Sequence, residues 1–438
     1  MTSRPLEPAA EQDRAAVAAL HAHGYRVADI QSLAHDHRPL AVRTPALRRT
    51  IAPGIHLRGT SVDLGEGCFT NAYTLSVDLE LIRADVVSTA DGFHLRDHVA
   101  ADAALAAVSG SFSFISDDPS YQPDEPRLDF CCRAGEVVSL PTATKPALLV
   151  RDGRPVIETL NATGTLTLGG HPYRWVGSKT AHHGAGHRPG TLVVFGAANC
   201  RVGYSENPRT GFLRHVDPDA NTTPPDPSAV DYVVAHTPND THRVVAVHPG
   251  GGADLFAGNF VLRAAHPWDT RLERGAPVEI TRIAGHDPRH LESGISLGPS
   301  VADAATGHTA AYDDGCLGTS PFRDTRHART LVGLHGRELT LQVLDGAPKS
   351  DTFRGTTPHE TAALCTAAGL DPHAMYHLDG GASSKIAYLD HDTTRVVGSM
   401  HYLQWPAEPR EPFRWRGLDG RVLRSALVLR ADHREEHE

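Results

Sequence analysis

The sequence lacks any apolar run long enough to cross a lipid bilayer, and residues 1–15 are polar and acidic, without the apolar segment of a secretory signal. Its six cysteines form no C-x-x-C pair and no spacing typical of a disulfide framework. Both absences point to a reducing compartment, in which buried cysteines stay free thiols. We therefore expect a cytoplasmic protein with no membrane partner.

An excess of positive charge is also absent. The formal net charge is −10 at pH 7, whereas nucleic-acid binding depends on clustered lysine and arginine. No nucleic-acid partner is expected, although a local basic pocket for a single phosphate is compatible with this charge. No cofactor is expected.

Size and composition are those of an ordinary globular protein, with 438 residues, 40% of them hydrophobic and 21% charged. Short alternating or apolar runs dominate, and helical patterns are few. We therefore predict an α+β fold with a mixed, largely antiparallel sheet core and a few packed helices, because the regular strand–helix alternation of a doubly wound sheet is missing. We expect a helical appendage and linker at 1–50, one main domain at 51–408 and an extension at 409–438.

Two stretches have the composition of helices. Residues 98–108 are rich in alanine, and residues 357–368 begin with Thr357 and Glu360 at the spacing of a capping box. A hairpin with an Asp-Gly turn is predicted at 148–157. Strands are predicted at 55–62, 69–87, 191–195, 230–247, 339–344 and 375–378.

The stretch 375–388 carries the strongest functional signal. A short apolar run ends on Asp379, and two glycines, small residues and two hydroxyls follow before a second apolar run. Glycines beside a carboxylate let a ligand approach the main chain, and serine hydroxyls with exposed N–H groups suit an oxyanion such as phosphate. The same residues are equally compatible with an ordinary Asp-Gly hairpin turn.

This stretch resembles the signature of the phosphodiester glycosidase family, usually written N-L-D-G-G-G-S-S. His377 stands where asparagine is usual, and Ala382 stands where the third glycine is usual. Residues 109–114 resemble the family's N-G-G-F-F segment, with Ser109 in place of asparagine, and residues 328–334 resemble P-R-T-A-V-G. Collinear similarity runs from about residue 54 to residue 405.

The resemblance implies cleavage of a bond between a sugar anomeric carbon and a phosphodiester. Arg329 is the candidate phosphate ligand, because a guanidinium binds phosphate bidentately; its alternative is a structural ion pair. Asp379 is the candidate nucleophile or general base, and Asp345 is its candidate partner or, alternatively, a turn aspartate. His377 is a candidate proton donor or else a packed histidine at a strand end. Further residues expected to bind phosphate or sugar are Thr330, Gly380, Gly381, Ser383, Ser384, Ser109 and Gly110.

Two other motifs compete with this interpretation. Residues 294–298 satisfy G-x-S-x-G, the nucleophile elbow of α/β-hydrolases, but the apolar strand before it and the helix after it are missing from the sequence pattern. We expect a substrate-lining loop there instead. Residues 182–187 contain three histidines, but they lack the helical spacing of a zinc site, so a solvated loop without metal is expected.

Together these features predict a cytoplasmic hydrolase that takes a sugar-1-phosphodiester or a nucleotide-sugar-like small molecule in a biosynthetic or metabolic pathway. Two alternatives stay open. The altered residues at 109, 377 and 382 are compatible with a relative that binds carbohydrate or phosphate without catalysis. The same fold could also transfer the sugar to an acceptor other than water.

Overall fold

The structure is a computed structural model, and the description below covers the following parts of the chain: residues 43–102, 104–113, 129–180, 190–200, 202–205, 213–216, 221–237, 241–265, 272–308, 325–347, 350–398, 403–404, 414–415 and 422–432. The predicted N-terminal helical appendage, up to residue 42, and the histidine-rich stretch 182–187 lie outside the described residues.

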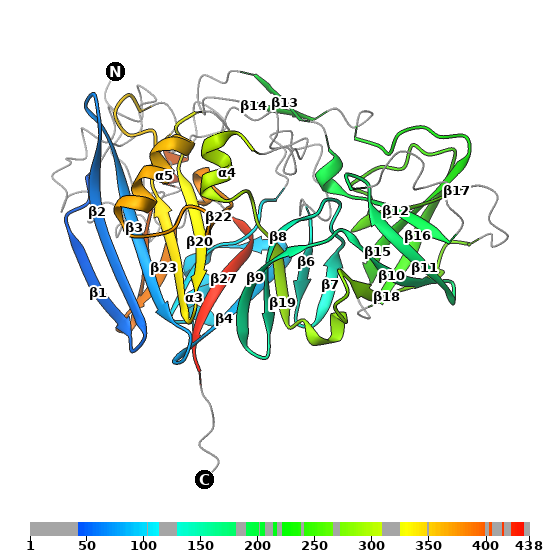
Figure 1. Cartoon of the computed structure of the whole chain (residues 1–438), viewed down its shortest axis with the longest axis horizontal. Helices are drawn as coiled ribbons and strands as arrows, with labels where there is room; N and C mark the ends of the chain where they lie inside the picture. Colours follow the sequence, from blue (N-terminus) through cyan, green and yellow to red (C-terminus); the bar gives the residue numbers. More distant parts are fainter. Residues whose placement is uncertain are drawn as a thin grey trace, which may run out of the picture.

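Two sheets pack face to face at one end of the molecule and hold the residues of the candidate site (Figure 1). In spatial order the first sheet consists of β1 (Leu47–Ala52), β2 (Ile55–Gly65), β3 (Cys68–Asp78), β21 (Glu338–Leu344), β20 (Arg329–His335) and β22 (Met375–Leu378). The second consists of β24 (Thr393–Val397), β23 (Ile386–Asp390), β5 (Ala106–Ser109), β27 (Leu423–Ala431) and β4 (Ile82–Phe93).

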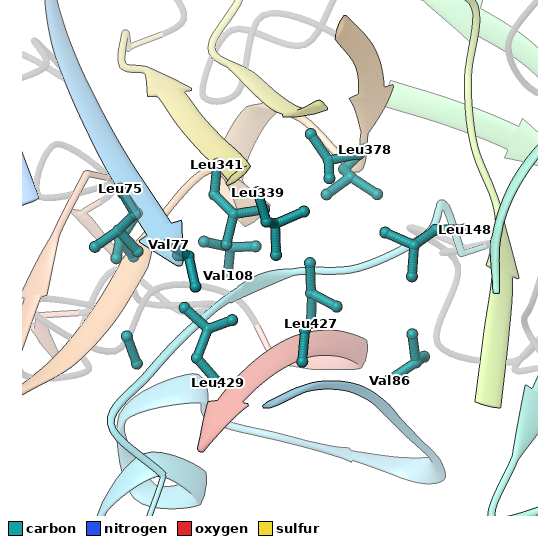
Figure 2. Close-up of a cluster of buried hydrophobic side chains, with 14 of the residues drawn as sticks. Leu75, Val77, Val86, Val108, Leu148, Leu339, Leu341, Leu378, Leu427 and Leu429 are labelled. Atoms are coloured by element: carbon teal, nitrogen blue, oxygen red, sulfur yellow. The ribbon is translucent and has the colours of Figure 1, made fainter. Parts of the chain in front are cut away.

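The main hydrophobic core lies between these two sheets, because each strand alternates its side chains between two faces. Leu75 and Leu341 come from the first sheet, Val108 and Leu427 come from the second, and all four are fully buried. Figure 2 shows these side chains converging, together with Leu148 of a third sheet. The core therefore fixes the relative position of β5 and β20, which carry candidate site residues at their ends.

A third sheet lies in the middle of the molecule, and a closed barrel forms the other end (Figure 1). The sheet consists of β7 (Glu136–Ser139), β6 (Cys131–Arg133), β19 (Ser293–Ser296), β8 (Lys145–Arg151) and β9 (Arg154–Leu160). The closed barrel consists of β10 (Thr163–Leu168), β11 (His171–Gly177), β12 (Thr191–Phe195), β17 (Phe260–Ala265), β15 (Ala229–Thr237), β16 (Thr241–Pro249) and β18 (Pro277–Ile283). Two short ribbons, β13 (Val202–Ser205) with β14 (Leu213–Val216) and β25 (Leu403–Gln404) with β26 (Arg414–Trp415), complete the described strands.

Helices are short and cover outer faces of the first two sheets. The α-helices are α3 (Leu95–Ala101), α4 (Val301–Thr306) and α5 (Pro358–Ala367), and the 3-10 turns are η2 (Ala197–Asn199), η4 (Pro288–His290) and η7 (Gly381–Ser383). Helices α4 and α5 pack on the first sheet through Val301, Leu331 and Cys365. No helix among the described residues combines the length and apolar character needed to cross a membrane.

The predicted α+β class is wrong, because the described residues are mostly β, with 55% strand and 11% helix. The largest local error is the helix predicted at 98–108. The helix α3 ends at Ala101, and Ala106–Ser109 form β5 between β23 and β27. Alanine favours helices when packing does not decide, but here Ala106 and Ala107 are fully buried in the middle of a sheet. The small side chain of Ala107 lets α3 pack closely, while Ala106 faces the main core.

Several local predictions are confirmed. The hairpin of β8 and β9 turns at Asp152 and Gly153, whose φ values of 49° and 71° are those of a left-handed two-residue turn. Helix α5 has the predicted capping box, in which Thr357 and Glu360 each accept the other's backbone N–H. The domain division, by contrast, stays a prediction: residues 409–438 were expected as a C-terminal extension, and they contribute β27, which pairs with both β4 and β5 inside the second sheet.

Candidate active site

The two residues on which the functional prediction depends lie at the same edge of the first sheet. Strands β20 and β22 are antiparallel, and Thr330 pairs with Leu378. Arg329 precedes Thr330 and Asp379 follows Leu378, so both leave their strands at the same end. Arg329 also pairs with Leu344 of β21, which brings Asp345 to this end as well. The fold thus gathers all three charged candidates from segments that are far apart in the sequence.

The loop after Asp379 is built by glycine. Gly381 has a φ of 63°, a backbone conformation that side chains disfavour, and its N–H donates to the Ala328 carbonyl oxygen at 2.9 Å. A Cβ on Gly380 would come within 2.8 Å of that same oxygen. The Ser383 and Ser384 amides donate to the Gly380 and Gly381 carbonyls. The amide groups of Gly381, Ser383 and Ser384 therefore close the turn. They already donate hydrogen bonds within the protein, so most of the loop amides that were predicted to bind phosphate are engaged elsewhere.

A chain of buried hydroxyls ties this loop to the second sheet. Ser109 Oγ lies 3.0 Å from the Asp379 carbonyl oxygen and 3.0 Å from Thr330 Oγ1, which in turn lies 3.2 Å from Ser384 Oγ. The side chains of Ser109, Thr330 and Ser384 are fully buried. Because a carbonyl oxygen only accepts, the Ser109 hydroxyl donates to Asp379. The Gly110 carbonyl also accepts the Asp379 N–H at 2.9 Å. Ser109 and Gly110 thus hold the backbone of Asp379, and Thr330 and Ser384 extend the same hydrogen-bonded chain. Their predicted role in binding substrate stays a prediction.

Arg329 is half-buried, and its guanidinium is held by main-chain carbonyls. Its Nε donates to the Thr356 carbonyl at 3.3 Å and its Nη2 to the Thr325 carbonyl at 3.0 Å. Burial lowers the pKa of Arg329 to about 10. The side chain is therefore still a cation at neutral pH, and removal of its hydration makes it a favourable partner for an anion.

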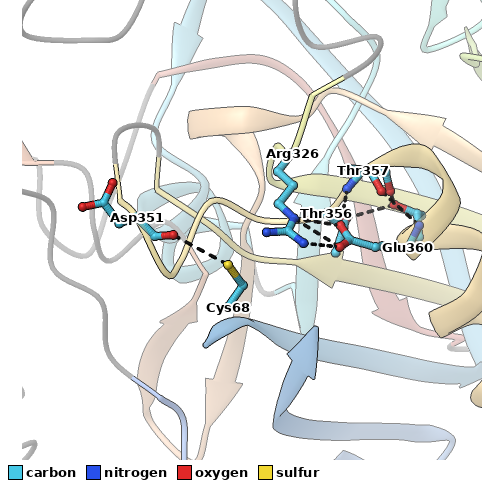
Figure 3. A network of polar contacts seen from close by, with 7 residues as sticks. Cys68, Arg326, Asp351, Thr356, Thr357 and Glu360 are labelled. Carbon is cyan, nitrogen blue, oxygen red and sulfur yellow. Dashed lines mark hydrogen bonds and ion pairs between the residues drawn. The ribbon is translucent and has the colours of Figure 1, made fainter. Parts of the chain in front are cut away.

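The segment that leads into β20 is fixed to the N-terminus of α5 (Figure 3). Arg326 Nε donates to both carboxylate oxygens of Glu360 at 3.1 Å, and the Thr357 N–H donates to the same carboxylate at 2.8 Å. Burial alone would raise the pKa of Glu360, but these hydrogen bonds outweigh it and lower that pKa. A backbone bridge between His327 and Thr356 adds two further hydrogen bonds, so the position of Arg329 is defined from both sides.

His377 lies beneath the site, 6% exposed. Its Nδ1 lies 3.0 Å from the Pro299 carbonyl oxygen. Burial, assisted by the nearby positive charge of Arg329, lowers the pKa of His377 to about 4 in spite of that hydrogen bond. The imidazole is therefore neutral at pH 7, which opposes the predicted role as a proton donor near neutral pH.

Asp345 is 1% exposed, and its Oδ1 accepts the N–H of Gly346 at 2.8 Å. Its carbonyl oxygen accepts the Thr70 hydroxyl at 2.7 Å. This is the arrangement of a turn aspartate, the alternative noted from the sequence. The predicted catalytic partnership of Asp345 with Asp379 stays a prediction.

The two competing motifs give no second site within the described residues. Ser296 of the G-x-S-x-G match lies in strand β19, 4% exposed, and its hydroxyl donates to the Phe130 carbonyl, so no nucleophile elbow forms. Instead, Gly298 donates its N–H to the His377 carbonyl at 2.8 Å, which places this loop beside the site as expected. No group of three metal-ligating side chains occurs among the residues described above.

Three neighbours of the site, Phe112, His327 and Pro299, were not singled out as site residues from the sequence. A Cβ on Gly298 would meet His377 Cβ at 3.0 Å and Phe112 Cε2 at 3.1 Å, so both side chains meet over this glycine. A Cβ on Gly381 would meet His327 Nε2 at 2.6 Å, which places that ring against the turn. The third neighbour is Pro299, whose carbonyl binds His377. Phe112 could have been found as the aromatic residue of the N-G-G-F-F resemblance, whereas nothing in the sequence links Pro299 to His377.

The cysteines depart from the expectation of free thiols. Cys200 is disulfide-bonded, while Cys68, Cys131, Cys132 and Cys365 are free. A disulfide persists more readily in an oxidising compartment than in the cytosol. The cytoplasmic location stays a prediction.

Several solved structures align with this chain, and the first of them supports the fold. A hypothetical protein from Synechocystis aligns with a TM-score of 0.50 and 13% identity over 88% of this chain and 64% of the other. This chain thus spans less than two thirds of that protein. A candidate exported protein of Burkholderia pseudomallei aligns at 0.46 with 20% identity over 83% of this chain and 74% of the other. The zebrafish N-acetylglucosamine-1-phosphodiester alpha-N-acetylglucosaminidase catalytic domain, auto-inhibited by its pro-peptide, aligns at 0.40 with 11% identity over 89% of this chain and 87% of the other.

A search of curated proteins finds no match to this sequence. The phosphodiester glycosidase family (NAGPA) matches residues 234–413, which include β20, β21, β22 and the loop after Asp379. The resemblance noted from individual motifs is therefore confirmed by a match across this whole segment. Residues 234–413 of this chain are thus similar to the phosphodiester glycosidase family, a family of glycosidase-type hydrolases.

Proposed function

We propose that this protein hydrolyses the bond between a sugar anomeric carbon and a phosphodiester, with a sugar-1-phosphodiester or a nucleotide-sugar-like compound as substrate. The observation that carries the proposal is the shared strand end of Arg329 and Asp379. Cleavage of such a bond requires a cation for the phosphate and a carboxylate for the oxocarbenium-like centre.

Arg329 is the phosphate ligand in this proposal. A half-buried guanidinium that is already oriented by the Thr356 and Thr325 carbonyls loses little further freedom when an anion binds. An anionic ester also compensates for the hydration that burial removes, which is the cause of the lowered pKa of Arg329. Phosphate is a fair leaving group, so neutralising its charge assists departure without a strong acid.

Asp379 is the catalytic carboxylate, acting as nucleophile or as general base. Its backbone is held on both sides, through its N–H to Gly110 and through its carbonyl to Ser109. A carboxylate on such a fixed backbone is oriented before substrate arrives, which is the main advantage that a protein has over water. Gly380, Gly381 and the serines of the turn support this orientation.

The experiment is an assay of the purified protein for free sugar release from an N-acetylglucosamine phosphodiester and from UDP-N-acetylglucosamine. Release that is abolished in Asp379→Asn supports the proposal. Binding of these compounds without release would favour a non-catalytic carbohydrate- or phosphate-binding relative. Appearance of the sugar on an added acceptor, in place of free sugar, would favour a transferase.

For the location, we propose the cytoplasm, because the six cysteines show no spacing typical of a disulfide framework. The disulfide of Cys200 is the observation that weighs against it. Trapping of thiols at the moment of cell lysis, followed by mass spectrometry of the Cys200 peptide, decides between a reduced cytoplasmic form and an oxidised form.

A further inference from the structure

An unexplained polar atom beside the proposed catalytic residues is Nε2 of His377. Its solvent exposure is negligible, and nothing in the described part of the chain forms a hydrogen bond with it. A buried polar atom without a partner destabilises the folded state, and such atoms are rare in folded proteins. An atom of this kind beside a candidate active site therefore points to a partner that arrives with the ligand.

The chemistry of that partner follows from the tautomer of His377. Nδ1 lies 3.0 Å from the Pro299 carbonyl oxygen, which can only accept a hydrogen bond. Nδ1 therefore carries the proton of the neutral imidazole. Nε2 is then a bare lone pair, which accepts a hydrogen bond and cannot donate one.

The position of the ring places this lone pair next to the proposed reaction centre. His377 pairs with Leu331 across the two strands, and Arg329 lies two residues before Leu331, so His377 and Arg329 are on the same face of the sheet. Arg329 and Asp379, the neighbours of His377 on this face, are both half-buried and keep contact with solvent. On this face of the sheet, His377 is the next side chain along from Asp379. A ligand that reaches Arg329 and Asp379 therefore lies beside the imidazole.

A phosphodiester cannot be the group that meets Nε2. Its oxygens carry no hydrogen at neutral pH, and a lone pair repels an anion. A sugar hydroxyl or an acetamido N–H can donate, and both are neutral. We propose that Nε2 of His377 accepts a hydrogen bond from a hydroxyl or N–H group of the sugar, so that His377 selects the sugar while Arg329 binds the phosphate.

This inference deepens the proposed function and rests on it. It also gives a meaning to the departure from the asparagine that is usual at this position of the signature. An asparagine side chain offers one acceptor and two donors, whereas this histidine offers an acceptor only. A substrate group that accepts without donating is therefore disfavoured at this position of the sugar.

The test combines ¹⁵N NMR of histidine-labelled protein with the hydrolysis assay, both with UDP-N-acetylglucosamine as the probe. The His377 signals are assigned by their disappearance in His377→Gln. We expect an unprotonated Nε2 in the free protein at pH 7, and a shift of that signal on adding the probe. In the assay, replacing one sugar hydroxyl by fluorine should lower kcat/KM by roughly 10- to 100-fold in the wild type, and by much less in His377→Leu. His377→Asn, which keeps an acceptor, should retain part of the discrimination.

The outcomes separate the two proposals. Hydrolysis without any shift of the Nε2 signal overturns the role of His377, shows that the atom meets a buried water only, and leaves the proposed function standing. A protonated Nε2 in the free protein overturns the role as well. A shift without hydrolysis supports the sugar contact and overturns the hydrolase. Neither shift nor hydrolysis overturns both.

Discussion

Arg329 and Asp379 leave adjacent antiparallel strands at the same end, one residue beyond the pair formed by Thr330 and Leu378. The two residues lie 50 positions apart in the sequence, since 379 minus 329 is 50. An antiparallel pair places residues directly opposite each other about 4.5–5.5 Å apart at Cα, so this register brings a cation and a carboxylate to one small region. The predictions below follow from this arrangement.

Asp379→Asn should lower kcat by roughly 100- to 10,000-fold, because it removes the carboxylate and keeps the shape of the side chain. KM should change little, since the phosphate ligand is intact. Steady-state kinetics with UDP-N-acetylglucosamine measure both constants. Asp345→Asn is the matched control: its oxygen can still accept the Gly346 N–H, so activity should stay within about tenfold of the wild type. An equal loss in both variants would instead make Asp345 a catalytic partner.

Arg329→Lys should weaken substrate binding by about tenfold or more, because an ammonium cannot form the bidentate contact of a guanidinium. The nearby Arg326→Lys is a suitable control, since Arg326 bonds to Glu360 and belongs to the helix cap. That variant should lower the melting temperature but not the affinity for an inert substrate analogue. Isothermal calorimetry with both variants checks the pair, and unchanged affinity in Arg329→Lys would exclude Arg329 as the phosphate ligand.

Ser109→Ala should reduce kcat more than it raises KM, because the hydroxyl that holds the Asp379 carbonyl is lost. The free energy of unfolding should fall by about 1–2 kcal/mol, as expected for a buried hydrogen bond. Ser111→Ala provides the control, since Ser111 Oγ donates to the Ser296 carbonyl at 2.9 Å instead of to Asp379. If both variants lose stability and neither loses kcat, the hydroxyl chain has only a structural role.

Stability should fall in mild acid. Burial lowers the pKa of His377 and of His242 to about 4, while an unfolded histidine titrates near 6.5. Between these values the unfolded chain binds more protons than the native protein, so the free energy of unfolding decreases as pH falls. The decrease should reach about 1.4 kcal/mol per pH unit for each histidine. Urea titrations between pH 7 and pH 4 measure the slope, which should be smaller in His377→Gln and in His242→Gln; an unchanged slope would contradict the burial of these neutral rings.

The sequence was most informative where the determining forces are local. The order of strand, acid, tight loop and strand around Asp379 is confirmed, because the apolar run of β22 and the glycines after it leave few alternatives. The capping box of α5 is confirmed for the same reason, since Thr357 and Glu360 act within one helical turn.

Tertiary contacts decided the features that the sequence did not reveal. The alanines of β5 form a strand because β5 pairs with β23 and β27 in the middle of the second sheet, and this replaced the predicted helix. The neutral state of His377 depends on Pro299, which lies 78 positions away along the chain. The buried Ser109 hydroxyl forms hydrogen bonds with Thr330 and with the Asp379 carbonyl, and nothing in the local sequence specifies these contacts.

The most direct test of the account is a crystal structure of Asp379→Asn with UDP-N-acetylglucosamine or an N-acetylglucosamine phosphodiester bound. The account predicts that the Arg329 guanidinium contacts the ester phosphate while the side chain at position 379 lies about 3–3.5 Å from the anomeric carbon. An ester that binds away from this strand end would contradict the account. So would an ester that binds here without its phosphate at Arg329 and its sugar at position 379.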